Sequence, residues 1–531
     1  MPDDKLAAVT QGMLHSWWAD RIPDRLALIS PHGDRTFADL NAQINRLSRA
    51  LRSRGLQPGD AVALMCTNEP AFLEVLYAAQ RTGLRLTPIN WHLTGEEAAY
   101  IIQNCEAKAF VCSGTLGDAV VVAAAAGGPG LVKINTGGYI PGFEMYNTVV
   151  AAEDGSDIAD PVLGTQMLYT SGTTGRPKGV HRTTAAVSAL ATINFCGYDE
   201  DYEASVDAHL LTGPLYHAAP LAFSVAVPLV YGVPLVVMDH WDPVEALRLI
   251  EQHSITHTHM VPTMFHRLLA LPAETRQGFD TSSLRFVIHG AAPCPVPVKQ
   301  RLIEWLGPVV VEYYAATEGL GTLVDSETWL AHPGTVGRPM APGLVKVADE
   351  AGNDLPPGEV GLVFLQAPAA TKFDYYGDTE KTTGAFRGDY FTLGDMGYMD
   401  AEGFLYLTDR TANLIISGGV NIYPAEVDGV LLEHPAVHDV ATIGVPDDDW
   451  GESVKAVVQL AEGVEGTDQL AAELMAFCRD HLAHFKCPRS VDFVSELPRE
   501  DTGKIFKRKL RDHYRGEAVQ GGTEADLRRQ S

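Results

Sequence analysis

The chain has 531 residues, of which 46% are apolar and 20% are charged, and its formal net charge is −27. This length exceeds what one hydrophobic core supports, so we expect two or more domains. The strong negative charge argues against nucleic acid or an anionic membrane as the main partner, since both require a basic surface. We therefore expect small-molecule partners and no nucleic acid.

Signals for a membrane or for secretion are missing from the sequence. No run of about 18 apolar residues exists to span a bilayer, and the opening residues lack the basic-then-apolar pattern of a signal peptide. The seven cysteines are odd in number and never form a C-x-x-C pair. This cysteine usage predicts reduced thiols in a cytoplasmic protein. We expect no integral membrane segment, and we consider a homodimer as the assembly.

Helix and strand patterns alternate along the first part of the chain. Residues 36–55 carry an apolar stripe at helical spacing, with Thr36 as a suitable N-cap and Gly55 as a suitable stop. The patterns that follow predict strands at 60–66, 84–90 and 108–113 and helices at 69–83 and 95–105. A second series predicts strands at 234–240, 257–262, 284–290 and 309–315 and a helix at 242–253.

This alternation predicts an α/β fold with parallel sheets covered by helices on both faces. From about Gly343 the pattern changes to short strands and turns, which favour a smaller antiparallel or barrel-like subdomain. From about Arg410 a small α+β unit follows. The polar residues 516–531 predict a disordered tail.

The stretch LYTSGTTGRPKGVH, residues 168–181, has the composition of a phosphate-binding loop. Its glycines allow sharp turns and close approach of a ligand, its hydroxyls and amides offer donors, and Lys178 adds a cation. The spacing does not fit Gly-x-x-x-x-Gly-Lys-Ser/Thr in any register, so the common phosphate loop is excluded. A Ser/Thr-rich surface turn is the alternative for this segment alone.

Four further blocks follow this loop in order: EYYAATEG (312–319), FTLGDMGYMDAEGFLYLTDR (391–410), IISGGVNIYPAEVD (415–428) and LPREDTGKIFKRKLR (497–511). Together the five blocks resemble the adenylate-forming superfamily, which includes acyl-CoA synthetases, adenylation domains of peptide synthetases and beetle luciferases. The resemblance covers about residues 10 to 513. It implies a large N-terminal domain (1–409), a hinge (410–412) and a small mobile C-terminal domain (413–515).

The resemblance implies an ATP site with bound Mg²⁺. Tyr314 would stack on the purine, Thr317 would donate to the α-phosphate, and Asp395 would accept from both ribose hydroxyls, with Arg410 reaching the same ribose. Glu318 would hold Mg²⁺, a hard cation that prefers oxygen ligands. The other implied ATP residues are Thr170, Ser171, Gly172, Thr173, Thr174, Lys178, Gly290, Ala291, Ala292 and Lys504.

Lys504 lies in the block DTGKIF and resembles the lysine that bridges the substrate carboxylate and the α-phosphate. Two anions must meet in that step, so a mobile cation, Mg²⁺ and buried donors are needed to cancel their repulsion. With Thr170 and Glu318, Lys504 makes up the implied catalytic set. Locally, the basic run at 504–511 is also compatible with a solvated face.

The second half-reaction requires a thiol at the acyl-adenylate. The resemblance implies that the small domain rotates about the hinge, withdrawing Lys504 and bringing in a loop that lines the coenzyme A channel. The implied coenzyme A residues are Ser417, Gly418 and Gly419. Ala412 stands in the hinge where the family often has Asp or Lys.

The resemblance implies an acid pocket near His217, a substrate gate, and near Ala315, whose methyl group would lie close to the path of the acyl chain. Residues 219–232, APLAFSVAVPLVYG, form an aliphatic wall that favours fatty, alicyclic, steroidal or aryl acids. The histidines of HSITHTHM (253–260) suggest a metal site, but zinc needs further ligands and no cysteine pair is near. Ordinary strand histidines near the pocket are the preferred interpretation.

The sequence therefore predicts an AMP-forming acid–thiol ligase that uses ATP, Mg²⁺ and coenzyme A to convert a hydrophobic acid to its thioester. Within the superfamily, the alternatives are an adenylating enzyme that loads a carrier protein in trans and a luciferase-like oxygenase. From another class, a nucleotide-binding scaffold without turnover is the alternative.

Overall fold

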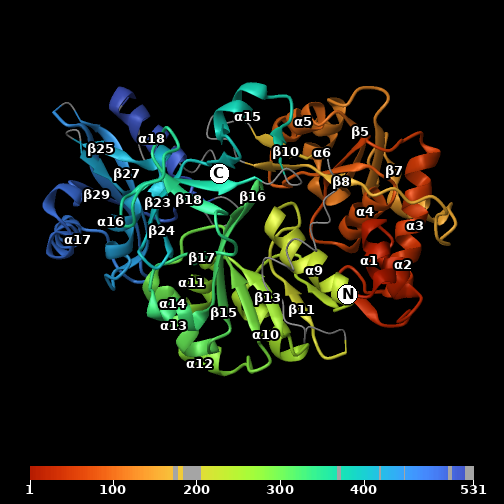
Figure 1. Cartoon of the computed structure of the whole chain (residues 1–531), viewed down its shortest axis with the longest axis horizontal. Helices are drawn as coiled ribbons and strands as arrows, with labels where there is room; N and C mark the ends of the chain where they lie inside the picture. The colour runs from red at the N-terminus through yellow and green to blue at the C-terminus, as the bar shows by residue number, and fades with distance from the viewer. Residues whose placement is uncertain are drawn as a thin grey trace.

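The computed structural model describes residues 1–170, 177–182, 205–367, 372–417, 420–447, 449–499 and 505–520. Two sheets built mainly from parallel strands form the body. Figure 1 shows one of them at the lower centre, around β13 and β15, and the other on the right, around β5 and β7. A C-terminal unit, drawn in blue, lies on the left.

The first sheet has the strand order β17-β16-β15-β14-β13-β11-β12-β1-β2. From β15 to β1 the neighbours are parallel, and the outer pairs at both edges are antiparallel. The strands predicted at 234–240, 257–262, 284–290 and 309–315 are confirmed as β12, β13, β14 and β15. The strands are β1 (Leu26–Ile29), β2 (Arg35–Thr36), β11 (His209–Leu211), β12 (Leu235–Val237), β13 (His257–Met260), β14 (Phe286–His289), β15 (Val310–Ala316), β16 (Gly319–Val324) and β17 (Arg338–Pro339).

The second sheet has the order β7-β6-β5-β3-β4-β8, and its pairs are parallel. Its strands are β3 (Ala61–Met65), β4 (Arg85–Pro88), β5 (Ala107–Ser113), β6 (Val132–Thr136), β7 (Glu144–Met145) and β8 (Thr165–Gln166). Val62 and Leu64 of β3 pack into one core, and Ala61, Ala63 and Met65 pack into another. Burial on both faces explains why β3 reads as a continuous apolar run.

Helices fill the space between the two sheets and cover their outer faces. The apolar stripe predicted for 36–55 is confirmed: Thr36 caps α3 in a capping box with Asp39. The helices of the inner layer are α3 (Phe37–Ser53), α4 (Pro70–Arg81), the π-helix η2 (Pro220–Ala226) and α9 (Val227–Tyr231). Outer faces are covered by α5 (Gly95–Asn104) and α6 (Asp118–Ala125), and by α10 (Pro243–Gln252), α11 (Pro262–Ala270) and α13 (Val296–Leu306). Shorter helices are α1 (Asp3–Thr10), α2 (Leu14–Ala19), η1 (Gly114–Leu116), α7 (Tyr146–Ala151), α12 (Ala273–Gln277) and α14 (Ser326–Ala331).

The antiparallel part expected from about Gly343 is confirmed. Its sheet has the order β21-β22-β19-β23-β24, with β18 also paired to β19. A small sheet, β20-β10-β9, connects it to the phosphate loop. The elements are β9 (Leu168–Thr170), β10 (Lys178–His181), β18 (Val345–Ala348), β19 (Gly361–Gln366), β20 (Asp374–Tyr375), α15 (Thr379–Ala385), β21 (Phe386–Arg387), β22 (Tyr390–Phe391), β23 (Asp395–Met399) and β24 (Leu405–Arg410).

The C-terminal unit has its own sheet, β26-β25-β28-β27, with β29 parallel to β28. Its elements are η3 (Thr411–Asn413), β25 (Ile415–Ser417), β26 (Val420–Ile422), α16 (Pro424–Leu431), β27 (Val437–Asp447), β28 (Gly451–Leu460), α17 (Asp468–His481), η4 (His484–Lys486), β29 (Ser490–Val494) and α18 (Lys507–Gln520). Helix α18 continues past Gly516, where the polar tail was expected to begin. Of the helices in the described part of the chain, none has the length and apolar character to span a bilayer.

Candidate active site

The candidate site lies where β14 and β15 end and where the small sheet β20-β10-β9 meets the β23–β24 hairpin. Ligands of parallel α/β sheets bind at the carboxyl ends of the strands, which is where these elements meet. Thr170 of β9 pairs directly with Lys178 of β10. This pairing closes the base of the phosphate loop, whose residues 171–176 lie outside the described ranges, so Ser171, Gly172, Thr173 and Thr174 are not placed.

Glu318, which is predicted to hold Mg²⁺ beside the phosphates, is buried, with 5% of its surface exposed. The hydroxyl of Tyr375 donates to Glu318 Oε1 over 3.0 Å, and Lys178 Nζ lies 4.7 Å from the centroid of the Tyr375 ring. Burial raises the pKa of the Glu318 carboxyl, and Tyr375 and Lys178 oppose that rise. Burial is also the largest cause that lowers the pKa of Lys178, followed by the charge of Lys381.

Thr317 and Glu318 form the two-residue turn between β15 and β16, because Ala316 pairs with Gly319. Arg182 Nη2 donates to the backbone oxygens of both turn residues, over 2.8 Å to Thr317 and 2.9 Å to Glu318. Arg182 therefore fixes the turn that presents the acid. Sequence reasoning missed Arg182 and Tyr375; the only signal for Arg182 was its place four residues after Lys178.

Asp395, the predicted ribose acceptor, is the first residue of β23 and is 8% exposed. Tyr314 donates its hydroxyl to Asp395 Oδ2 over 2.8 Å, and Arg410 Nε donates to Oδ1 over 2.7 Å. Burial, and then the charge of Asp395, raise the pKa of Tyr314. The structure thus brings together all three predicted residues and orients the carboxylate from both sides.

The strand end predicted to face adenine, residues 290–292, follows β14 directly. A Cβ on Gly290 would lie 2.6 Å from Tyr313 Cζ, so only glycine fits between the strand end and that ring. Ala291 has a φ of 68°, in the left-handed region that costs a non-glycine residue about 1–2 kcal/mol. Such strain is concentrated at functional sites, which agrees with a ligand-binding role for this turn and for Ala292.

Of the residues predicted to bind the acid, Ala315 faces the opposite side of β15 from Tyr314. His217 precedes the π-helix η2, a helix type that is frequent at functional sites, and Ala315 packs on the apolar cluster beneath that helix. His257 and His259 are buried in β13, and His259 Nε2 lies 3.0 Å from the hydroxyl of Tyr313. Among the described residues, no three metal-binding side chains converge.

The hinge region connects β24 to the C-terminal unit. Ala412 lies in η3, and its carbonyl accepts a hydrogen bond from Arg511 Nη1 of α18 over 2.7 Å. Ser417 ends β25 and is 9% exposed. The predicted coenzyme A residues Gly418 and Gly419 and the predicted catalytic Lys504 lie outside the described residues.

This fold and this arrangement define the class of protein. A parallel α/β body presents a buried acid beside a lysine, and a second, oriented acid suited to a ribose, with a small domain after a linker. These are the features of an adenylate-forming enzyme. The buried Glu318 carboxylate, whose Oε1 is already held by Tyr375, fits Mg²⁺, because a carboxylate has further acceptor positions and Mg²⁺ prefers oxygen.

Comparison with known proteins agrees with this class. The pattern of the AMP-binding enzyme family matches residues 16–373, and that of the AMP-binding enzyme C-terminal domain matches residues 426–504. The chain belongs to this family. It is an AMP-forming acid–thiol ligase that uses ATP, Mg²⁺ and coenzyme A.

Relatives and solved structures match over nearly the whole length. A feruloyl-CoA synthase from an Amycolatopsis species is 34% identical over 522 residues, covering 94% of this chain and 99% of the relative. The long-chain-fatty-acid–CoA ligase FadD13 from Mycobacterium tuberculosis is 33% identical over 500 residues, covering 93% and 96%. The crystal structure of ATP-bound MatB from Rhodopseudomonas palustris has a TM-score of 0.82 at 29% identity, covering 95% of this chain and 99% of that chain.

Proposed function

We propose that this ligase adenylates a hydrophobic carboxylic acid in the site around Glu318 and Asp395 and passes the acyl group to coenzyme A. The observation that carries the proposal is the pair of oriented carboxylates. Glu318 is held by Tyr375, and Asp395 is held by Tyr314 and Arg410. One acid suits the metal–phosphate end of a nucleotide, and the other suits its ribose.

In the adenylation step, Asp395 and Arg410 bind the ribose, and Gly290, Ala291 and Ala292 lie against the adenine. Lys178, Thr170 and Thr317 bind the phosphates, with Ser171, Gly172, Thr173 and Thr174 of the same loop. Glu318 would hold Mg²⁺, which supplies positive charge to the phosphates when bound. Lys504 approaches the acid carboxylate and the α-phosphate and cancels their repulsion.

In the thioester step, we place the pivot at Ala412 and the thiol channel along Ser417, Gly418 and Gly419. The hydrogen bond from Arg511 to the Ala412 carbonyl supports a role of this linker in setting the domain pose. We also propose domain boundaries at 409, 412 and 515. A cytoplasmic location and a homodimer stay predictions from the sequence.

The hydrophobic character of the acid is supported by the wall beneath η2. Phe223, Val227, Ile288 and Val311 are buried there, and Ala315 packs against them. The two relatives named above are ligases for a feruloyl group and for a long-chain fatty acid. Both of these acyl groups have large apolar parts. His217, at the entrance to η2, is proposed to contact the acid near its carboxylate.

Acid-dependent exchange of pyrophosphate into ATP tests the adenylation step, and thioester formation tests the acceptor. We expect exchange with one or more hydrophobic acids and thioester formed with free coenzyme A. Lys504→Ala should abolish most of the exchange, whereas Lys509→Ala, an exposed lysine in the same basic run, should not. Thioester formed on an acyl carrier protein but not on coenzyme A would replace the proposed acceptor. ATP binding without exchange across a broad acid panel would indicate a scaffold.

A further inference from the structure

Three aromatic side chains from three different elements meet beneath the proposed acid site. Phe223 of η2, His259 of β13 and Tyr313 of β15 are 4%, 2% and 5% exposed. The ring centroids of Phe223 and Tyr313 are 4.6 Å apart, and those of Phe223 and His259 are 5.4 Å apart with the planes nearly parallel. We refer to these three residues as the aromatic floor.

Two residues of the aromatic floor, Phe223 and Tyr313, share an apolar cluster with Ala315, one of the residues proposed to meet the acid. Ala315 follows Tyr313 by two positions, so both side chains point to the same face of the first sheet. That face also carries the cluster containing Phe223, against which Ala315 packs. An acid whose carboxylate lies near His217 and whose body passes Ala315 therefore reaches the floor next.

The three rings of the floor are in contact and leave no passage between them for an alkyl chain. Carbon atoms in contact are about 3.5–4.0 Å apart, so rings whose centroids are 4.6 Å and 5.4 Å apart already touch. The hydrogen bond between Tyr313 and His259 Nε2 fixes the two polar rings relative to each other. Burial lowers the pKa of His259 to about 3, so its ring is neutral and Nε2 can accept a hydrogen bond from the Tyr313 hydroxyl.

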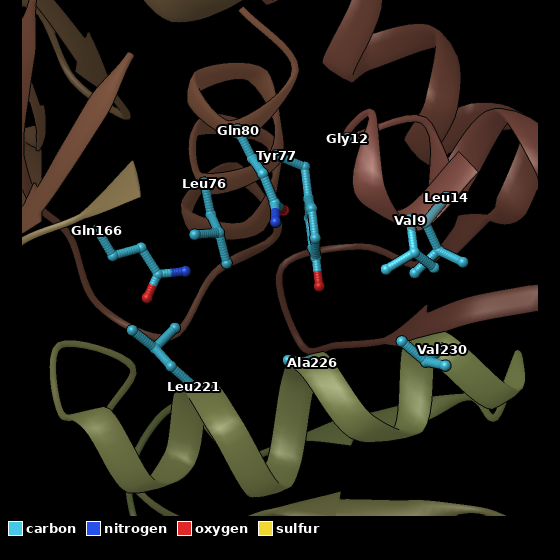
Figure 2. A pocket seen from close by; sticks show the side chains of 10 residues that line it. All are labelled: Val9, Gly12, Leu14, Leu76, Tyr77, Gln80, Gln166, Leu221, Ala226 and Val230. Carbon is cyan, nitrogen blue, oxygen red and sulfur yellow. The ribbon is translucent and has the colours of Figure 1, made fainter. Parts of the chain in front are cut away.

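On the opposite side of η2, the described residues enclose a small cavity. This cavity is lined by Leu221, Ala226 and Val230, with α4 and the N-terminal helices closing it (Figure 2). Its volume is about 30 Å³, far below the roughly 300–1,000 Å³ of pockets that hold small-molecule ligands. Such a space is too small for a whole hexadecanoyl chain.

We infer that the aromatic floor restricts this ligase to compact acids, with one ring on a short linker or a short aliphatic chain, and rejects long-chain fatty acids. The inference rests on the proposed function, because it takes the acid to bind between His217 and Ala315. It narrows the fatty, alicyclic, steroidal or aryl acids considered from the sequence to the compact members. Phe223 and Tyr313 become the residues that determine specificity.

The test is a kcat/KM profile for benzoic, cinnamic, butanoic, octanoic and hexadecanoic acids with ATP and coenzyme A. We expect hexadecanoic acid to be at least about 100-fold poorer than the best compact acid, since a filled site cannot expand to admit it. Phe223→Ala removes one side of the floor and should improve octanoic or hexadecanoic acid relative to the compact acid by about tenfold or more. The matched control is Phe110→Leu, which truncates a buried aromatic residue of β5 in a different apolar cluster and should leave the chain-length profile as in the wild type.

Binding of non-hydrolysable acyl-sulfamoyl adenosines of the same acids gives a second measurement that needs no turnover. It should show the same order, with the long-chain analogue gaining affinity only in Phe223→Ala. Hexadecanoic acid used as well as the compact acids by the wild type, or a folded Phe223→Ala with an unchanged profile, would overturn the inference alone. No exchange and no analogue binding with any acid would overturn the proposed function and the inference with it.

Discussion

Tyr375 holds both charged groups of the phosphate side with one side chain. Its hydroxyl donates to Glu318 Oε1 over 3.0 Å, and the same ring has Lys178 Nζ at 4.7 Å from its centroid. Tyr375 belongs to β20 and pairs with Val180 of β10, two residues after Lys178. The strand pairing and the Tyr375 side chain therefore set this geometry together. We therefore assign Tyr375 as a positioning residue for the Glu318 carboxylate and the Lys178 ammonium.

Substitution of Tyr375 separates these two contacts. Tyr375→Phe removes the hydrogen bond to Glu318 and keeps the ring, so we expect about a tenfold higher Mg²⁺ requirement in ATP–pyrophosphate exchange with little change in the KM for the acid. Tyr375→Leu also removes the ring contact and should raise the KM for ATP further. The neighbouring Tyr376, whose hydroxyl donates to Glu106, provides the control: Tyr376→Phe should leave the Mg²⁺ dependence unchanged. An equal response of both phenylalanine variants would contradict the assignment.

The ribose side makes a second prediction. Tyr314→Phe deletes the donor to Asp395 Oδ2 and leaves Arg410 on Oδ1, so the carboxylate loses one of its two restraints. A hydrogen bond to a charged group contributes about 1.5–3 kcal/mol, so the KM for ATP should rise about tenfold or more. Tyr398→Phe, on the same hairpin but stacked on Tyr406, should not change it. ATP titration of initial exchange rates measures both, and a normal KM in Tyr314→Phe would show that Arg410 alone orients Asp395.

The sequence alone predicted the elements whose signals are local. Thr36 and the stripe after it define α3, and the buried run 61–65 defines β3, because capping and apolar periodicity act within a few residues. The five ordered blocks predicted Glu318, Asp395 and Arg410, and the structure brings Asp395 and Arg410 into contact with each other. Short-range sequence patterns were sufficient to predict these two elements, and the family resemblance was sufficient to predict these three site residues.

Other features had no local signal. Strand β16 was not predicted, because the turn at Thr317 and Glu318 lacks the Asn-Gly or Asp-Gly residues that mark two-residue hairpins. Arg182 holds that turn from 135 residues away, and Tyr375 reaches Glu318 across 57 residues. The π-helical form of η2 was also missed, since its apolar sequence is compatible with an ordinary buried helix.

Buried neutral histidine predicts the response of stability to acid. His15 is fully buried against Tyr77, with ring centroids 4.0 Å apart, and within the described residues neither ring nitrogen has a hydrogen-bond partner. Burial lowers its pKa from 6.5 to about 3. The unfolded chain therefore binds a proton at His15 that the folded chain does not bind between these values, so stability falls as pH falls through this window.

The slope from one such group is about 1.4 kcal/mol per pH unit. His15→Phe should therefore reduce the loss of unfolding free energy between pH 6.5 and pH 5 by roughly 1–2 kcal/mol. Urea unfolding at several pH values measures this loss. His240→Gln replaces a histidine whose side chain is 80% exposed and should keep the wild-type slope. A steeper slope in His15→Phe than in the wild type would contradict the sign.

A buried ion pair supports the strand that carries Tyr313 and Tyr314. Lys299 Nζ of α13 lies 2.7 Å from Glu312 Oε2 of β15, and the side chains are 0% and 6% exposed. Burial is the largest cause that raises the pKa of Glu312, and Lys299 opposes it. Lys299→Met removes the ammonium from the buried carboxylate, beside which the neutral His289 ring lies with Nε2 3.9 Å from Oε2, and should cost about 3–5 kcal/mol of unfolding free energy at pH 7.

Removal of both charges isolates the cause of that loss. In Lys299→Met with Glu312→Leu neither charge of this pair remains, so most of the lost stability should return. The single variant should also recover partly at lower pH, because protonation of Glu312 removes the unpaired charge. Chemical unfolding of the wild type, the single variant and the double variant at two pH values measures both effects. A double variant as unstable as Lys299→Met at pH 7 would show that the packing of the lysine stem against Trp329, over which its ammonium lies at 4.6 Å, outweighs the charge.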